Sequence, residues 1–442
     1  MRVSNLRGML LGGALAGLLA GAAQAADAPR DVVGRVADQI EGRYFDAGRA
    51  AKLAAALRAE AARGDYDRYA APLDLAQALT VRLKPEDTHF QVVWSAKASA
   101  APGGPRPDAA AVVAEAAEAA AAERRQNYGF RAVEILPGAL AVVRMSYFAD
   151  FEGADGAAKQ AADAAMAMTA GAEAVIFDLR ENGGGSPAMV GYLVGHFVPE
   201  GARVYNTFKS RGPDADERPT AAPKAGRRLE LPLYVLVSGR TASAAESFSY
   251  TLQAARRAVV VGEASAGGAN PGAMAPIGDG FAVFVSDGSP VNPITGKNWE
   301  GTGVVPDVAV PVADALTKAE QLALAKLLEG PGEAAAKTEA RWALEALGPA
   351  APVKALSDYP GAYGVRSVVV EGGRLQIVQS RRPPLWLKPL APDTFAVEGA
   401  AVPTRIRFDR DAAGKVTGMT QTLSSGQASR FPRAERHVPP RL

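Results

Sequence analysis

The sequence predicts an α/β protein whose core is preceded by helices and followed by a small antiparallel β unit. Two separated segments predict the core, because each reads as an apolar strand, a turn of small residues and the start of a helix. They are Ala174–Pro187 (AVIFDLRENGGGSP) and Leu233–Glu246 (LYVLVSGRTASAAE). The helices follow from apolar residues at helical spacing, and the β unit from short alternating runs between glycine and proline turns.

Residues 1–25 read as a signal peptide that is removed on export. Arg2 and Arg7 precede an apolar stretch rich in Leu, Ala and Gly, and the small residues Ala23 and Ala25 predict cleavage before Ala26. The chain has no cysteine, so neither lipidation nor disulfides are expected. We therefore expect a periplasmic or secreted bacterial protein without stable membrane insertion after cleavage.

Residues 26–95 predict a helical domain, and residues 96–126 a linker followed by a helix. Within the domain, interruptions at Gly64 and Pro72 separate runs of apolar residues at helical spacing. These apolar residues are Val32, Val33, Val36, Ile40, Leu53, Leu57, Leu75, Leu79 and Leu83. The linker reads ASAAPGGPRP over residues 98–107, and an Ala/Glu-rich helix follows to about Arg125.

The core is assigned to residues 127–312, a helical connector to 313–348 and a β domain to 349–442. In the β domain, alternating runs such as Leu375–Val378 and Thr404–Phe408 lie between turn sequences. No catalytic pattern occurs there. Two interpretations of this domain stay open: it docks substrate or another subunit, or it is a structural appendage.

Ser243 is the candidate nucleophile. It lies at the first turn of a predicted helix directly after a strand, where backbone N–H groups are free to bind an oxyanion. The plain alternative is an ordinary N-cap, and Glu246 three residues later fits a capping box. The glycines at 183–185 either allow a close backbone approach to a ligand or form an ordinary loop. A phosphate-binding loop is disfavoured, because neither glycine-rich phosphate pattern is present.

Four motifs together resemble the C-terminal-processing (tail-specific) serine peptidases and the tricorn core proteases. In chain order they read NYGFRAVEILPG, DLRENGGG, TASAAE and WEGTGVVPDVAV, between Asn127 and Val310. Within this superfamily, the chain is most similar to the branch named after the interphotoreceptor retinoid-binding protein. The resemblance implies peptide-bond hydrolysis on a crotonase-like ββα core, preceded by a helical bundle. The peptide-binding domain of the PDZ type that the processing branch carries is not evident here.

One departure from the processing branch bears on the mechanism. That branch uses a Ser/Lys dyad with its lysine in a G-K-G turn, whereas this chain reads GEASAGGANPG over Gly262–Gly272 and has no lysine there. A serine hydroxyl needs a base, so another residue must supply it. In tricorn-like members, the family pattern offers an upstream histidine and a glutamate before G-V-x-P-D. Their counterparts here are His89 in EDTHF and Glu300 in WEGTGVVPD.

The resemblance thus implies a triad of Ser243, His89 and Glu300, with the N–H groups of Ala244 and Gly184 as the oxyanion hole. His89 would accept the Ser243 proton, and Glu300 would orient the imidazole. Without the resemblance, His89 reads as a solvated loop histidine and Glu300 as a surface carboxylate in a tight turn.

Other polar residues receive structural interpretations. Of the three histidines, His196 lies in an apolar helix and reads as a core residue, and His437 lies in a tail whose mobility argues against catalysis. Ser186 and Ser247 are weaker candidates for the nucleophile. The polar residues beside the glycine run are expected to fix its turn; they are Asp178, Arg180 and Asn182.

Charge and spacing exclude several other functions. Lys and Arg number 49 against 47 for Asp and Glu, and the two leader arginines account for the difference, so no nucleic-acid partner is expected. No paired-histidine pattern occurs, and neither a metal nor a cofactor is expected. The expected activity is hydrolysis of unfolded proteins or peptides. The alternatives are a non-catalytic carrier of hydrophobic ligands or peptides on the same fold, or an esterase or amidase; homo-oligomerisation stays open.

Overall fold

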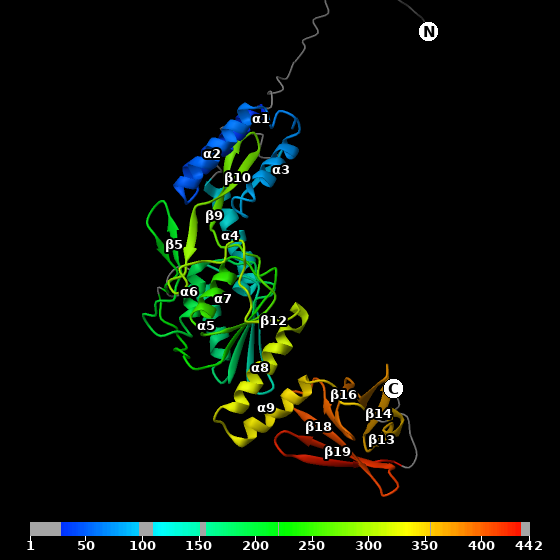
Figure 1. Cartoon of the computed structure of the whole chain (residues 1–442). Helices are drawn as coiled ribbons and strands as arrows, with labels where there is room; N and C mark the ends of the chain where they lie inside the picture. The colour runs from blue at the N-terminus through cyan, green and yellow to red at the C-terminus, as the bar shows by residue number, and fades with distance from the viewer. Residues whose placement is uncertain (1–27, 97–108, 151–155, 220, 354, 435–442) are drawn as a thin grey trace, which may run out of the picture.

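The computed structural model describes residues 28–96, 109–150, 156–219, 221–353 and 355–434. They form a helical unit near the N-terminus, a central α/β core and a C-terminal β unit (Figure 1). The predicted leader, the predicted linker at residues 98–107 and His437 lie outside the described residues. Within those ranges, none of the helices combines the length and the apolar character that crossing a membrane requires.

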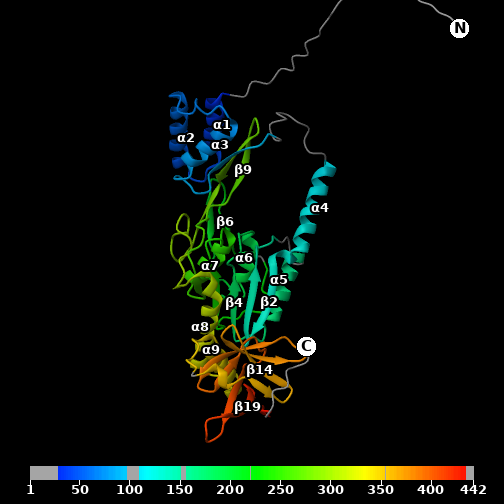
Figure 2. The same ribbon diagram turned by 90° about the vertical axis from the view of Figure 1, so that its right-hand side faces the viewer.

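The N-terminal unit combines two distant segments of the chain. It contains α1 (Pro29–Arg43), α2 (Ala47–Ala62), α3 (Pro72–Leu83) and β1 (Gln91–Trp94). A ribbon from the core, β9 (Gly272–Gly278) and β10 (Phe281–Ser286), pairs with β1 in the order β1-β10-β9. Apolar side chains of the ribbon share one cluster with the helices, and Figure 2 shows β9 reaching up to them. The unit that contains His89 is therefore built partly from core residues.

The central sheet has six strands in the order β12-β8-β7-β4-β3-β2. The strands are β2 (Phe130–Leu136), β3 (Leu140–Met145), β4 (Ala174–Asp178), β7 (Leu233–Val237), β8 (Val259–Gly262) and β12 (Val308–Ala309). Only the β2–β3 pair is antiparallel. Because β4 and β7 are parallel neighbours, the turns that follow them lie at the same edge of the sheet.

Helices cover both faces of this sheet. One face packs on α5 (Ala157–Met168), α6 (Pro187–Val194) and α7 (Ala244–Ala254), and the other on α8 (Ala315–Glu329) and α9 (Ala334–Leu347). Alternate residues of a strand point to opposite faces, so Val175 and Phe177 of β4 join the first cluster while Ala174 and Ile176 join the second. Burial on both faces explains why β4 and β7 read as continuous apolar runs.

Two smaller elements flank the core. A three-stranded sheet has the order β11-β5-β6, from β5 (Thr207–Ser210), β6 (Ala215–Asp216) and β11 (Gly288–Val291). Helix α4 (Ala109–Arg125) runs from the core toward the level of the N-terminal unit (Figure 2).

The C-terminal unit is an eight-stranded antiparallel meander that nearly closes into a barrel. Its strands pair in chain order: β13 (Gly361–Tyr363), β14 (Arg366–Glu371), β15 (Arg374–Gln379), β16 (Leu385–Ala391), β17 (Thr394–Val397), β18 (Thr404–Arg410), β19 (Val416–Leu423) and β20 (Ala428–Pro432). An isolated bridge between Tyr363 and Arg433 joins the two ends of the sheet.

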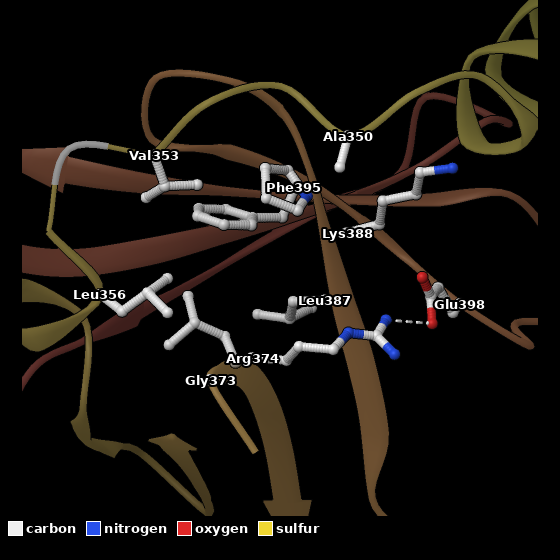
Figure 3. Close-up of a pocket in the computed structure, with 11 residues that line it drawn as sticks. Ala350, Val353, Leu356, Gly373, Arg374, Leu387, Lys388, Phe395 and Glu398 are labelled. Carbon is white, nitrogen blue, oxygen red and sulfur yellow. Dashed lines mark hydrogen bonds and ion pairs between the residues drawn. The ribbon is translucent and has the colours of Figure 1, made fainter. Parts of the chain in front are cut away.

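A pocket of about 580 Å³ lies at the edge of this unit (Figure 3). Val353, Leu356 and Phe395 form its apolar side, and an ion pair of 2.6 Å between Arg374 and Glu398 borders it. Phe395 has no exposed surface, so the floor of the pocket belongs to the packed core of the β unit.

Candidate active site

Ser243 occupies a strained turn between β7 and α7. Its backbone has φ 53° and ψ −121°, and a positive φ is uncommon for a residue with a side chain. The residue is exposed, whereas Ala244 and Ala245 behind it are buried. The turn therefore presents the Ser243 hydroxyl at the surface from the N-terminal end of a helix.

The carboxylate of Glu246 holds this turn in place. It has no exposed surface, and its Oε2 accepts the Ser243 N–H at 2.7 Å. The same carboxylate accepts the N–H groups of Gly267 at 2.6 Å and Gly268 at 2.9 Å, and the hydroxyl of Ser265 at 2.5 Å. Of these hydrogen bonds, the predicted capping box accounts only for the one between the Ser243 N–H and Glu246. Glu246 also ties the nucleophile turn to the Gly262–Gly272 segment, where the processing branch has its lysine.

The glycine turn after β4 packs directly against Ser243. A Cβ atom at Gly184 would lie 2.6 Å from the Ser243 Cβ and 3.1 Å from its Oγ, and the φ of Gly184 is +115°. Only glycine fits this contact and this backbone conformation. As expected, Asn182 fixes the turn and Arg180 pairs with Asp178.

The two predicted oxyanion donors differ in the structure. The Ala244 N–H makes no hydrogen bond with any described residue. The Gly184 N–H instead donates to Asn182 Oδ1 at 2.9 Å, because the asparagine side chain turns back onto the glycine run. The expectation of a free N–H at Gly184 is therefore corrected: this group is already satisfied within its own turn.

His89 lies in the turn between α3 and β1, with two carboxylates beside one ring nitrogen. Its Nδ1 is 3.2 Å from Asp87 Oδ1 and 3.3 Å from Glu300 Oε1. Glu300 is itself held in position: Oε2 accepts the N–H groups of Ala269 and Asn270, and Oε1 accepts the hydroxyl of Thr88. The structure thus brings His89 and Glu300 together, although they are far apart in the sequence.

These contacts shift the ionisation of all three groups. Hydrogen bonds with Asp87 first and Glu300 second raise the pKa of His89 to about 9, although burial opposes the change. Burial would raise the pKa of each carboxyl group, but hydrogen bonds, with those from His89 foremost, and the charge of His89 together leave the pKa of Asp87 and of Glu300 below the ordinary value. The site therefore rests at neutral pH as an imidazolium beside two carboxylates.

Gly268 lies beside the His89 ring and also beside the Glu246 carboxylate that holds the Ser243 turn. A Cβ atom at Gly268 would lie 3.0 Å from His89 Nε2 and 3.6 Å from Glu246 Oε2, the oxygen that accepts the Ser243 N–H. Nε2 thus lies beside Gly268, while Nδ1 lies beside the carboxylates of Asp87 and Glu300. Among the described residues, no hydrogen bond joins the Ser243 hydroxyl to the His89 ring.

The other predicted candidates lie elsewhere. His196 is fully buried, and burial lowers its pKa to about 4, so it is a neutral core residue. Ser186 caps α6 and donates to Asp150. Ser247 is buried and hydrogen-bonded to Glu217 and Asn206.

Asp87 is the site residue that sequence reasoning missed. Its signal was present in EDTHF, where an acidic residue stands two positions before the histidine. Asp87, His89 and Glu300 also offer ligand atoms within 4.8 Å of one another, which is close enough to hold a metal ion. The expectation of no metal relied on sequence spacing, and spacing cannot reveal a cluster whose members are so distant along the chain.

Comparison with known proteins identifies the core. Residues 139–310 match the model of peptidase family S41. A candidate peptidase of Parabacteroides merdae is 18% identical, with 69% of this chain and 100% of that chain covered and a TM-score of 0.46. The photosystem II D1 C-terminal processing protease is 25% identical over 39% of this chain and 42% of its own, with a TM-score of 0.30. The tricorn protease is 15% identical over 48% of this chain and 19% of its own, with a TM-score of 0.28.

With TM-scores this low, the similarity of whole folds carries no argument, and the informative comparison is the match of the core. That match contains the glycine turn, Ser243, Glu246 and Glu300. Residues 139–310, which contain these residues of the site, thus match peptidase family S41, and the match supports a serine-type peptidase.

Proposed function

We propose that this chain hydrolyses peptide bonds of unfolded proteins or peptides through an acyl-enzyme on Ser243. The observation that carries the proposal is the exposed, strained serine that Gly184 and Glu246 hold at the edge of the sheet. Strained backbone is often found at catalytic residues, because the surrounding contacts must maintain it. An ordinary N-cap needs no positive φ.

His89 acts as the base and Glu300 as a carboxylate partner in this mechanism. Nε2 takes the Ser243 proton while Oγ bonds to the carbonyl carbon and the carbonyl electron pair moves onto the oxygen. When the carbonyl re-forms, the C–N bond breaks and the leaving nitrogen takes the proton from Nε2. Water then repeats the sequence on the acyl-enzyme and releases the acid and free Ser243.

The orientation of the ring supports these roles. The carboxylates contact Nδ1, which leaves Nε2 beside Gly268. A resting imidazolium has no free lone pair for the hydroxyl proton, so His89 must lose a proton before it can act as the base. We propose that substrate binding and loss of this proton bring the two groups into contact.

The oxyanion is proposed to bind the Ala244 N–H and a second N–H from the glycines at 183–185. The free Ala244 N–H at the start of α7 supports the first donor. Since Gly184 donates to Asn182, its neighbours Gly183 and Gly185 are the alternatives. Removing one such donor typically costs about 10²-fold to 10³-fold in rate.

Two finer features are also proposed rather than established. The Gly262–Gly272 segment without a lysine favours the Ser/His/Glu branch over the Ser/Lys branch, and the core is proposed to be crotonase-like. The leader sequence supports export to the periplasm or beyond. N-terminal sequencing of the exported protein tests this: we expect Ala26 as the first residue, and retention of Met1 would refute export by cleavage.

The decisive experiment compares Ser243→Ala with Ser186→Ala on an unstructured protein substrate. We expect Ser243→Ala to abolish peptide hydrolysis and Ser186→Ala to retain it, because Ser186 caps α6. Circular dichroism confirms that both variants fold. Undiminished hydrolysis by Ser243→Ala would reject the assignment. A protein that hydrolyses small esters but not peptides would be an esterase. A protein that binds lipid stoichiometrically and turns over no substrate would be a carrier.

A further inference from the structure

Two carboxylates lie beside the ring nitrogen Nδ1 of His89, whereas a catalytic triad contains only one. A neutral imidazole with its proton on Nδ1 offers one N–H there, yet Asp87 Oδ1 and Glu300 Oε1 lie at nearly equal distances of 3.2 and 3.3 Å. The two acceptors must share this hydrogen. The environments of the two carboxylates show which one fixes the ring.

Asp87 is the more buried of the two and holds His89 at two points. Its side chain is 1% exposed, against 20% for Glu300, so solvent screens its charge less. The same oxygen that contacts the ring accepts the His89 backbone N–H at 2.9 Å. An aspartate that bonds the main chain two residues on forms a local turn, which sets the direction of the side chain at that position.

The far oxygen of Asp87 is also fixed. Asn270 Nδ2 donates to Asp87 Oδ2 at 3.2 Å, and the backbone N–H of the same asparagine donates to Glu300 Oε2 at 3.0 Å. Asn270 therefore ties both carboxylates together. Burial first and the charge of Asp87 second raise the pKa of Tyr44 in the N-terminal unit.

We propose that Asp87 is the positioning residue that orients His89, with Glu300 as a second carboxylate, so that the site works as a Ser/His/Asp/Glu tetrad. The catalytic consequence rests on the proposed function, whereas the orientation of the ring does not. The charged groups that face the ring are Asp87 and Glu300 at Nδ1 and Glu246 across Gly268. Phe284 packs near the ring, with its centroid 6.0 Å away.

The direct test is an NMR titration of His89 in the Ser243→Ala protein, which cannot turn over substrate. The chain has only three histidines, so their imidazole signals are readily assigned. We compare Asp87→Asn and Glu300→Gln with the exposed control Asp74→Asn. The expected result is that Asp87→Asn moves the His89 midpoint down from about 9 by at least one pH unit and further than Glu300→Gln does, while the control leaves it unchanged.

Activity provides the second measurement, in protein with an intact Ser243. With Asp87→Asn, we expect kcat to fall on the order of 10-fold to 100-fold with little change in KM, because an orienting partner rather than a substrate contact is lost. Asp87→Glu keeps the negative charge, so its His89 titration midpoint should stay above that of Asp87→Asn. The same variant replaces Asp87→Asn in the test if Asp87→Asn does not fold.

The proposal is overturned if Asp87→Asn leaves the midpoint of His89 unchanged while Glu300→Gln lowers it. Where Asp87→Asn does not fold, the proposal is overturned if Glu300→Gln alone returns the midpoint of His89 to the ordinary value of about 6.5 although Asp87 is intact. A protein that hydrolyses no peptide but shows the expected titration would reject the proposed function and leave the role of Asp87 intact.

Discussion

Replacing Glu246 with glutamine tests whether its carboxylate maintains the nucleophile turn. The buried carboxylate has two donors on each oxygen: the N–H groups of Ser243 and Gly268 on Oε2, and the Gly267 N–H and Ser265 hydroxyl on Oε1. A glutamine keeps one oxygen and turns an NH₂ group toward the other two donors. Hydrogen bonds to charged groups contribute about 1.5–3 kcal/mol each, so losing two should cost on the order of 3–6 kcal/mol.

Urea unfolding, followed by near-UV circular dichroism, measures this change in the free energy of unfolding. Glu371→Gln is the matched control, because Glu371 is exposed and such substitutions usually change stability by less than about 0.5 kcal/mol. Peptide hydrolysis should also fall in Glu246→Gln, since the positive φ of Ser243 loses its support. A Glu246→Gln protein as stable and as active as the control would refute this account of the turn.

Two further predictions concern the base and the glycine turn. Because only neutral His89 can accept a proton, and its pKa is raised to about 9, kcat/KM should rise with pH from 7 and level off above about 9. A pH–rate profile that is already level at pH 7 would contradict this ionisation. The contribution of the imidazolium to the free energy of unfolding is complete below the ordinary pKa of about 6.5 and is lost as the pH rises through 9. Gly184→Ala should lower kcat by more than about 10²-fold, because its Cβ would lie 2.6 Å from the Ser243 Cβ. Gly171→Ala is the control, since Gly171 is exposed, lies outside the proposed site and has nothing within 4 Å of an added Cβ. Equal activity of the two variants in peptide hydrolysis would count against the close packing of Gly184 on Ser243.

Local sequence patterns predicted the elements that position Ser243. The apolar runs became β4 and β7, and the small-residue turns lie where the strands end. The serine peptidase class followed from the resemblance and agrees with the S41 match. The pairing of His89 with Glu300 also came from the resemblance alone, since no local pattern relates residues so far apart.

Long-range contacts account for what the sequence did not reveal. The pairing of β1 with β10 places core residues inside the N-terminal unit, and nothing in either strand specifies its partner. Alternation predicted the C-terminal strands but not the bridge from Tyr363 to Arg433 that nearly closes them into a barrel. Asp87 was overlooked because an aspartate in a loop more often stabilises a turn, and here it does so while also contacting the ring.

The central claim is that His89 activates the hydroxyl of Ser243. The most direct measurement is the rate of modification by a fluorophosphonate, followed by intact mass spectrometry and peptide mapping, in the unmodified chain and in His89→Gln. The account predicts a single adduct on Ser243, with a rate that increases up to about pH 9 and falls sharply in His89→Gln. An adduct on another residue, or an equal rate in His89→Gln, would contradict it.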